Sequence, residues 1–201
     1  MTRLTPDAIK RAIDAFECDH HKRTEILYSS FELRGLRPAA VMIPLIVNNG
    51  DWKIVLTQRS AILEEHRGQV AFPGGAKEAS DENLQWTALR EMQEEIGVKP
   101  EDVEVFGHLC DIPIITNYMV RIFVGQIPWP YPLVISEDEV DSVFTLPLLW
   151  LADPKHHTIH FRSFAGREFP VIYFDLYDGY QLWGASAEMT LTLLSALDPV
   201  F

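Results

Sequence analysis

The sequence has few cysteines, no long apolar run and no targeting segment, and each shortage excludes a class of protein. Its two cysteines, Cys18 and Cys110, lie far apart and have the spacing of neither a metal site nor a disulfide framework. No segment approaches the roughly 18 uninterrupted apolar residues of a membrane span, and no basic start leads into an apolar stretch. We therefore expect a soluble protein of the reducing cytoplasm, with no membrane partner.

Basic residues are also scarce: 17 lysines and arginines stand against 29 aspartates and glutamates, which gives a formal charge of -12. This balance argues against nucleic acid or an anionic membrane as a partner, because both require a basic surface. An acidic protein that acts on a phosphorylated small molecule must instead use metal ions and a few local cations. The length of 201 residues, 47% of them hydrophobic, fits one domain over 1–201.

Hydrophobic periodicity and turn signals predict a mixed α/β chain. An N-terminal helix is expected over about 6–18, a β-hairpin over 39–58 with its turn at 48–51, and an irregular stretch over 60–75. A central helix follows from an N-cap at Ser80 to a stop at Gly97. Further strands are predicted over 103–109, 118–126, 158–162 and 171–176, and an apolar helix over 184–197.

The central helix carries the most informative segment, the sequence REMQEEIGV at 90–98. Glu91, Glu94 and Glu95 are spaced i, i+3 and i+4, so a helix brings their side chains to one face. Charge runs of this kind usually form a solvated surface. Converging carboxylates repel each other, however, and oxygen-rich clusters suit a hard cation such as Mg²⁺ or Mn²⁺.

This segment resembles the signature of the Nudix hydrolases, G-x5-E-x7-R-E-U-x-E-E-x-G-U, in which U is aliphatic. Glu82 stands at the required distance before Arg90, while Ala76 occupies the glycine position and Gly75 lies one residue further away. The remaining places are filled by Arg90, Glu91, Met92, Glu94, Glu95, Gly97 and Val98. The resemblance implies an α/β/α sandwich around a mixed β-sheet, with the motif helix packed on it.

The preceding stretch from Leu56 to Gly75 is similar to the extra signature of one Nudix branch, the coenzyme A pyrophosphatases, which reads L-L-T-x-R-S-x-x-L-x-x-H-x-G-Q-V-A-F-P-G-G. That branch also carries the one-residue insertion between glycine and glutamate. The resemblance implies metal-dependent cleavage of the pyrophosphate of coenzyme A, or of its derivatives, to 3′,5′-ADP and 4′-phosphopantetheine or its acyl derivative.

Roles for individual residues follow from the same resemblance. It implies Glu91 and Glu95 as ligands of Mg²⁺ or Mn²⁺, with the Gly74 carbonyl as an additional ligand. Arg90 would orient the glutamates, because the guanidinium fork suits bidentate contacts with carboxylates. Glu94 is either a further ligand or the general base. The base could equally come from a separate loop, for which Glu137 and Glu139 are the candidates.

Substrate recognition has its own candidates in the stretch before the glycines. Arg59, His66, Arg67 and Gln69 could bind substrate phosphates, or they could make ordinary structural hydrogen bonds in a loop. Two other functions compete with the first: hydrolysis of another nucleoside diphosphate compound, such as a dinucleotide or ADP-ribose, and nucleotide sensing without catalysis. The complete set of motif glutamates disfavours the sensing module. A homodimer is among the oligomeric states left open.

Overall fold

A long β-hairpin forms the centre of the fold. The computed structural model describes residues 4–18, 35–60, 68–164 and 167–201. Strands β1 (Arg37–Asn48) and β2 (Asp51–Arg59) pair antiparallel. Asn49 and Gly50 join them with φ angles of 54° and 87°, and two positive φ angles in a row are typical of the tight hairpin turn that an Asn-Gly sequence favours. The hairpin predicted from the sequence is confirmed.

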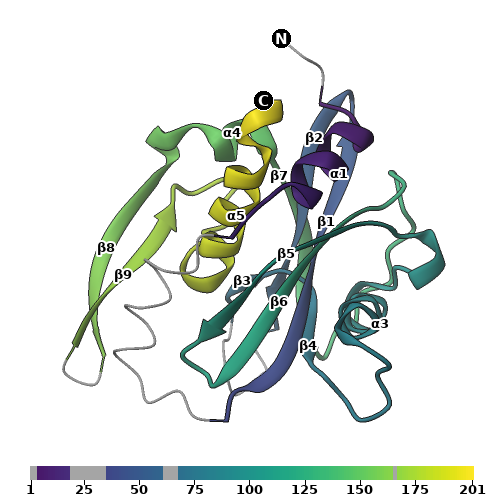
Figure 1. Ribbon diagram of the computed structural model, residues 1–201, viewed down its shortest axis with the longest axis horizontal. Helices are drawn as coiled ribbons and strands as arrows, with labels where there is room; N and C mark the ends of the chain where they lie inside the picture. The colour runs from purple at the N-terminus through teal and green to yellow at the C-terminus, as the bar shows by residue number, and fades with distance from the viewer. Residues whose placement is uncertain (1–3, 19–34, 61–67, 165–166) are drawn as a thin grey trace.

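Five further strands complete a mixed sheet around this hairpin (Figure 1). The strand order is β3-β2-β1-β6-β5, with β4 paired to β1 and β7 paired to β2. Only the β1–β6 pairing is parallel among the described pairs. The bounds of these strands are β3 (Val70–Ala71), β4 (Gly74–Ala76), β5 (Glu104–Ile114), β6 (Tyr118–Gln126) and β7 (Val140–Pro147).

Two of these findings correct the sequence analysis. The stretch over 60–75 was expected to be irregular, but it contains β3 and most of β4, and the two glycines lie in β4. Lacking a side chain, Gly74 can approach the backbone of β1 closely, which is one of the uses of glycine in a strand. Strand β7 was not predicted.

Helices cover both faces of the sheet, as Figure 1 shows, and form the predicted α/β/α sandwich. Side chains of β1 alternate between the two layers. Met42 and Ile46 pack in the core beneath helix α3 (Leu84–Ile96), while Ile43 and Leu45 pack in the core that includes helices α1 (Pro6–Asp14) and α5 (Gly184–Leu197). Strand β1 is therefore buried on both faces, which explains its continuous apolar sequence.

The helix boundaries differ in part from the predicted ones. Helix α1 ends at Asp14, earlier than the predicted residue 18, whereas α5 has the predicted bounds. Helix α3 begins after Asn83, whose side chain accepts a hydrogen bond from the Trp86 N–H at 2.9 Å. Asn83, and not Ser80, is thus the N-cap. Gly97 ends the helix with a φ of 73°, as expected for a glycine C-cap.

The second half of the chain adds a separate two-stranded sheet of β8 (His157–Phe164) and β9 (Arg167–Phe174). A short helix, α4 (Leu148–Ala152), precedes it, and three 3₁₀ turns lie at η1 (Pro100–Asp102), η2 (Pro154–His156) and η3 (Asp198–Val200). None of the helices in the described ranges is long and apolar enough to cross a membrane.

The cysteines overturn an expectation. Cys18 and Cys110 form a disulfide, with their Cα atoms 5.9 Å apart and a sequence separation of 92. Helix α1 packs on β5, and this contact brings the residues that follow the helix next to Cys110. Sequence spacing could not show the pairing, because it depends on how distant segments pack.

Candidate active site

The Glu95 carboxylate is the most deeply buried acid of the motif helix. Only 3% of the residue is exposed, and its carboxylate accepts a hydrogen bond from the Gly74 N–H of β4. Burial raises the pKa of Glu95 to about 8, from an ordinary value of 4.5. The positive charge of Arg59 opposes that rise, while the negative charges of Glu91 and Glu139 add to it. An acid in this setting is stabilised by any nearby cation.

Glu91 lies one turn before Glu95 and packs against the second glycine. A side chain on Gly75 would collide with the Glu91 carboxylate, and one on Gly74 would collide with the backbone of β1 at Ala40 and Val41. Burial also raises the pKa of Glu91. The two glycines therefore leave room for the Glu91 and Glu95 carboxylates, and the negative charge of Glu91 adds to the raised pKa of Glu95.

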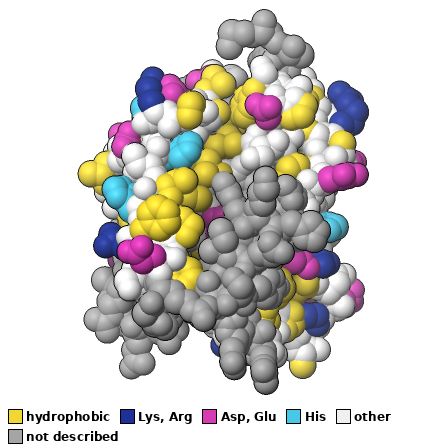
Figure 2. All heavy atoms as spheres, turned by 60° about the vertical axis from the view of Figure 1, so that its left-hand side comes forward, with side chains coloured by type: hydrophobic (Ala, Val, Ile, Leu, Met, Phe, Trp, Pro, Cys, Tyr) yellow, Lys and Arg dark blue, Asp and Glu magenta, His cyan; other side chains and the backbone are white. Residues whose placement is uncertain are grey.

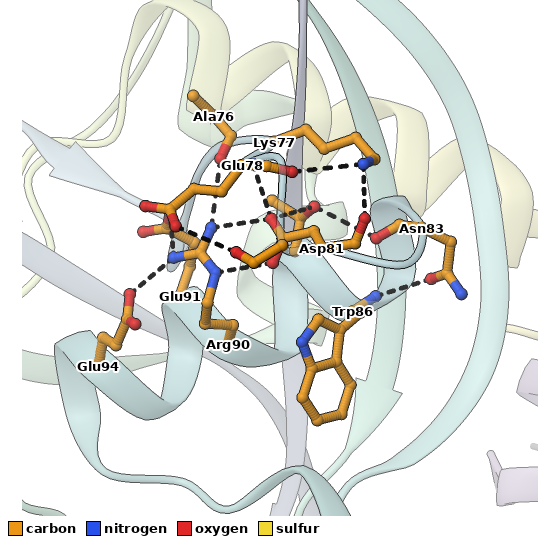
Figure 3. A network of polar contacts seen from close by, with 11 residues as sticks. Ala76, Lys77, Glu78, Asp81, Asn83, Trp86, Arg90, Glu91 and Glu94 are labelled. Carbon is orange, nitrogen blue, oxygen red and sulfur yellow. Dashed lines mark hydrogen bonds and ion pairs between the residues drawn. The ribbon is translucent and has the colours of Figure 1, made fainter.

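Arg90 forms a network of polar contacts with the motif glutamates and with the loop before the helix, as Figure 3 shows. Its guanidinium donates to Asp81 through two bonds of 2.9 Å and 3.1 Å and to the Ala76 carbonyl at 3.2 Å. The same group contacts the carboxylates of Glu91 at 3.0 Å and Glu94 at 2.7 Å. These contacts join Arg90 to two of the motif glutamates, and its orienting role stays a prediction.

Asp81 is the functional candidate that the sequence analysis missed. Its side chain is fully buried, and besides Arg90 it accepts hydrogen bonds from the Thr87 hydroxyl at 3.0 Å and the Glu78 N–H at 2.9 Å. The Arg90 guanidinium holds the pKa of Asp81 far below its usual range. In the sequence Asp81 is one acid among several before the motif, so only the folded loop distinguishes it.

Glu94 differs from its two neighbours. Its side chain is 52% exposed and paired with Arg90, whereas the Glu91 side chain is only 16% exposed and Glu95 is buried. The three glutamates predicted to converge are thus divided into a buried pair and one residue at the solvent edge. Whether Glu94 is a ligand or a base stays a prediction.

One loop brings a further acid to the buried pair. Val134 and Ser136 donate backbone hydrogen bonds to Ile96 and Glu95 carbonyls at 3.1 Å and 3.0 Å, so the loop is attached to the end of α3. Glu139 is half-buried, and its charge raises the pKa of Glu91 and of Glu95. Glu137 is exposed. Of the two loop candidates for the base, Glu139 is the one whose charge reaches the buried pair.

Arg59 lies at the end of β2, near Glu95. Its Nε atom is buried and has no hydrogen-bond partner in the described part of the chain. Backbone bonds of 2.9 Å and 3.1 Å tie Arg59 to Gln69 and Gly68, so Gln69 stands beside it on the neighbouring segment. A buried guanidinium nitrogen without a partner is a natural place for an anionic oxygen. His66 and Arg67 lie outside the described residues.

The carboxylate oxygens of Glu91 and Glu95 are of the kind that divalent cations prefer as ligands. Glu91 and Glu95 supply hard oxygen donors whose charged forms are disfavoured by burial, and a cation would favour them again. Within the described ranges, no group of three or more histidine, cysteine or acidic side chains has a metal-binding arrangement. The Gly74 N–H faces Glu95. The Gly74 carbonyl stays a prediction as a ligand.

A mixed sheet covered by a helix that carries these carboxylates gives the chain an α/β fold with an acidic candidate site. The pattern of the NUDIX domain matches residues 36–166, and the chain belongs to the Nudix family. It is 44% identical over 154 residues to the Nudix hydrolase NudL of Citrobacter koseri, covering 75% of this chain and 78% of that protein. The NudL of Escherichia coli strain SMS-3-5 is 42% identical over the same length, with the same coverage of both chains. The protein is therefore a pyrophosphohydrolase.

Solved structures agree on the fold. A MutT/nudix family protein from Enterococcus faecalis superposes with a TM-score of 0.52 and 17% identity, over 98% of this chain and 74% of that one. The Nudix hydrolase RenU of M. smegmatis gives a TM-score of 0.51 and 15% identity, over 82% of this chain and 88% of that one. The Nudix fold expected from the motif is confirmed.

Proposed function

We propose that this Nudix hydrolase cleaves the pyrophosphate bond of coenzyme A, or of its derivatives, to 3′,5′-ADP and 4′-phosphopantetheine or its acyl derivative. The observation that carries the proposal is the continuous resemblance to the coenzyme A pyrophosphatases from Leu56 to Val98. The folded chain supports it, because the ends of that stretch meet: Arg59 acts electrostatically on Glu95, and Gly74 and Gly75 contact the motif glutamates.

In this proposal Glu91 and Glu95 hold Mg²⁺ or Mn²⁺. A divalent cation held by these two residues would neutralise charge on the phosphoryl oxygens and would make water easier to ionise. The protein's own contribution is to keep the two carboxylates buried between Arg90 and the glycines, so that their geometry is set before substrate binds. Glu139 and Glu94 are the candidates for the base that takes the proton of the attacking water.

Arg59 is proposed to bind a phosphoryl oxygen of the substrate. Its buried Nε would gain a partner, and its positive charge is one of few in a chain whose net charge is -12. A charged hydrogen bond of this kind contributes about 1.5–3 kcal/mol. Gln69, tied to the Arg59 backbone, is proposed to line the same side of the substrate.

A substrate panel tests the proposed function. The protein would be incubated with Mg²⁺ or Mn²⁺ and with coenzyme A, acetyl coenzyme A, a dinucleotide and ADP-ribose, and the products identified by mass spectrometry. We expect 3′,5′-ADP from coenzyme A or its thioester. Turnover of the dinucleotide or ADP-ribose without 3′,5′-ADP from coenzyme A would overturn the substrate assignment, and binding without turnover of any compound would indicate a sensing module.

We also propose a cytoplasmic location, which rests on the scarcity of cysteine in the chain. The Cys18–Cys110 disulfide is the observation that stands against it, because disulfides rarely persist in a reducing compartment. Cell fractionation with detection of the protein tests the location: the proposal predicts recovery with cytoplasmic marker proteins, and recovery outside the cytoplasmic fraction would refute it.

A further inference from the structure

Strand β8 forms an open edge on the side of the molecule away from α3 (Figure 1). It pairs antiparallel with β9 from His157 opposite Phe174 onward. The far side of β9 is partly closed, because the Phe174 N–H donates to the Leu182 carbonyl at 2.8 Å and Tyr173 forms a bridge with Trp183. As far as the structure describes the chain, β8 has no second strand partner. Its outer edge presents backbone donors and acceptors for another strand.

The edge also carries exposed apolar side chains. Ile159 is 55% exposed and Phe161 68% exposed, and both lie on the same face of β8, opposite Ile172 and Pro170 of β9. Figure 2, which turns this side of the molecule forward, shows hydrophobic side chains gathered with histidines beside them. Natural edge strands usually carry charges that discourage pairing. An exposed phenylalanine and isoleucine on a free edge therefore call for a covering partner.

The charge of β8 distinguishes it from the rest of the surface. The sequence HTIHFRSF has no acidic residue, in a chain with a formal charge of -12. Two copies of so acidic a protein repel each other over most of their surfaces, and the repulsion is smallest where acidic side chains are absent. Arg162 is the one strand residue with a permanent charge.

We propose that β8 is the interface of a homodimer, in which the β8 strands of two copies pair antiparallel about a twofold axis at His160. In this register Ile159 stands opposite Phe161 of the second copy, so each exposed apolar side chain covers another. Arg162 stands opposite Thr158 of the second copy, which avoids two facing arginines. The β8–β9 sheets of the two copies would then join into a single sheet of four strands. The strand fits a second copy because its pattern is self-complementary about His160, as an isologous interface requires.

Sedimentation velocity of the full-length protein over a range of concentrations tests the dimer. Phe161→Lys places a positive charge beside each apolar contact and is expected to weaken the dimer by at least tenfold. Leu149→Lys on α4 is the matched control, because Leu149 is also a highly exposed apolar residue, at 61%, but lies outside strand β8. The control should dimerise like the wild type. A wild-type protein that stays monomeric at all concentrations, or a Phe161→Lys dimer as strong as the wild type, overturns the proposal.

Cysteine cross-linking tests the register. In antiparallel pairs the Cα atoms of facing residues are about 4.5–5.5 Å apart, within disulfide range. His160→Cys should therefore give a covalent dimer under mild oxidation. In the same register the two copies of Ser163→Cys are about 20 Å apart, at about 3.3 Å per residue, and should not cross-link. Equal cross-linking of both variants, or none with His160→Cys, refutes the twofold axis at His160.

Discussion

The buried acid Glu95 predicts an unusual dependence of stability on pH in the metal-free protein. Burial raises the pKa of Glu95 to about 8 in the folded state, against 4.5 for the exposed group. Between these two values the folded chain holds a proton that the unfolded chain has lost. The free energy of unfolding therefore falls as pH rises through this window, and the contribution of Glu95 is fully present only below pH 4.5.

The magnitude follows from the width of the window. Each pH unit corresponds to about 1.4 kcal/mol, so the whole span from 4.5 to about 8 amounts to roughly 5 kcal/mol. Glu91, whose pKa burial also raises, changes stability in the same direction. The pKa of Asp81 is lowered in the folded state, so Asp81 changes the stability only below its ordinary pKa of 3.8. It therefore does not affect the slope between pH 4.5 and about 8.

Urea unfolding at several pH values between 5 and 8, with EDTA present, measures this dependence. Glu95→Gln keeps the shape of the side chain and removes its ionisation, so the slope of its unfolding free energy against pH should be shallower than that of the wild type by about 1.4 kcal/mol per pH unit. Glu101→Gln, at an exposed position, serves as the control and should behave like the wild type. Parallel curves for the wild type and Glu95→Gln would refute the burial of an ionisable Glu95.

Three further substitutions probe the surrounding contacts. Asp81→Asn leaves the Arg90 charge without its buried partner and should lower the unfolding free energy by about 3–5 kcal/mol, measured by urea unfolding, whereas an effect under about 1 kcal/mol would contradict the buried pair. Gly75→Ala adds a methyl group where the Glu91 carboxylate lies, so we expect metal affinity by calorimetry to fall at least tenfold; unchanged affinity would show that the glycine is not needed. Glu94→Gln removes a half-exposed ion pair and should cost less than about 1 kcal/mol of stability, so a loss of turnover by orders of magnitude would show that Glu94 acts in catalysis, as base or as metal ligand, and near-normal turnover would favour Glu139 as the base.

Local sequence signals predicted the elements whose causes are local. The Asn49-Gly50 turn, the end of α3 at Gly97 and the bounds of α5 follow from turn chemistry, capping and apolar periodicity. The start of α3 was placed three residues early, because Ser80 and Asn83 are both good N-caps and the choice depends on the loop that folds around Asp81.

Features that depend on distant contacts could not be predicted in this way. The Cys18–Cys110 bond requires α1 to pack on β5, and the difference between Glu94 and Glu95 requires the sheet beneath α3. A spacing of i, i+3 and i+4 places three glutamates within about one face of a helix, but only packing decides which of them is buried. The same holds for Glu137 and Glu139, which are two residues apart in the sequence and differ in burial.

The central claim is that the buried pair Glu91 and Glu95 supports hydrolysis of coenzyme A. The most direct measurement is the kcat/KM for coenzyme A with Mg²⁺, compared between wild type, Glu95→Gln and the exposed control Glu101→Gln, with the proteins shown to be folded. The account predicts formation of 3′,5′-ADP by the wild type and the control, and a loss of at least 100-fold in Glu95→Gln. Comparable rates in all three proteins, or no 3′,5′-ADP from the wild type, would contradict it.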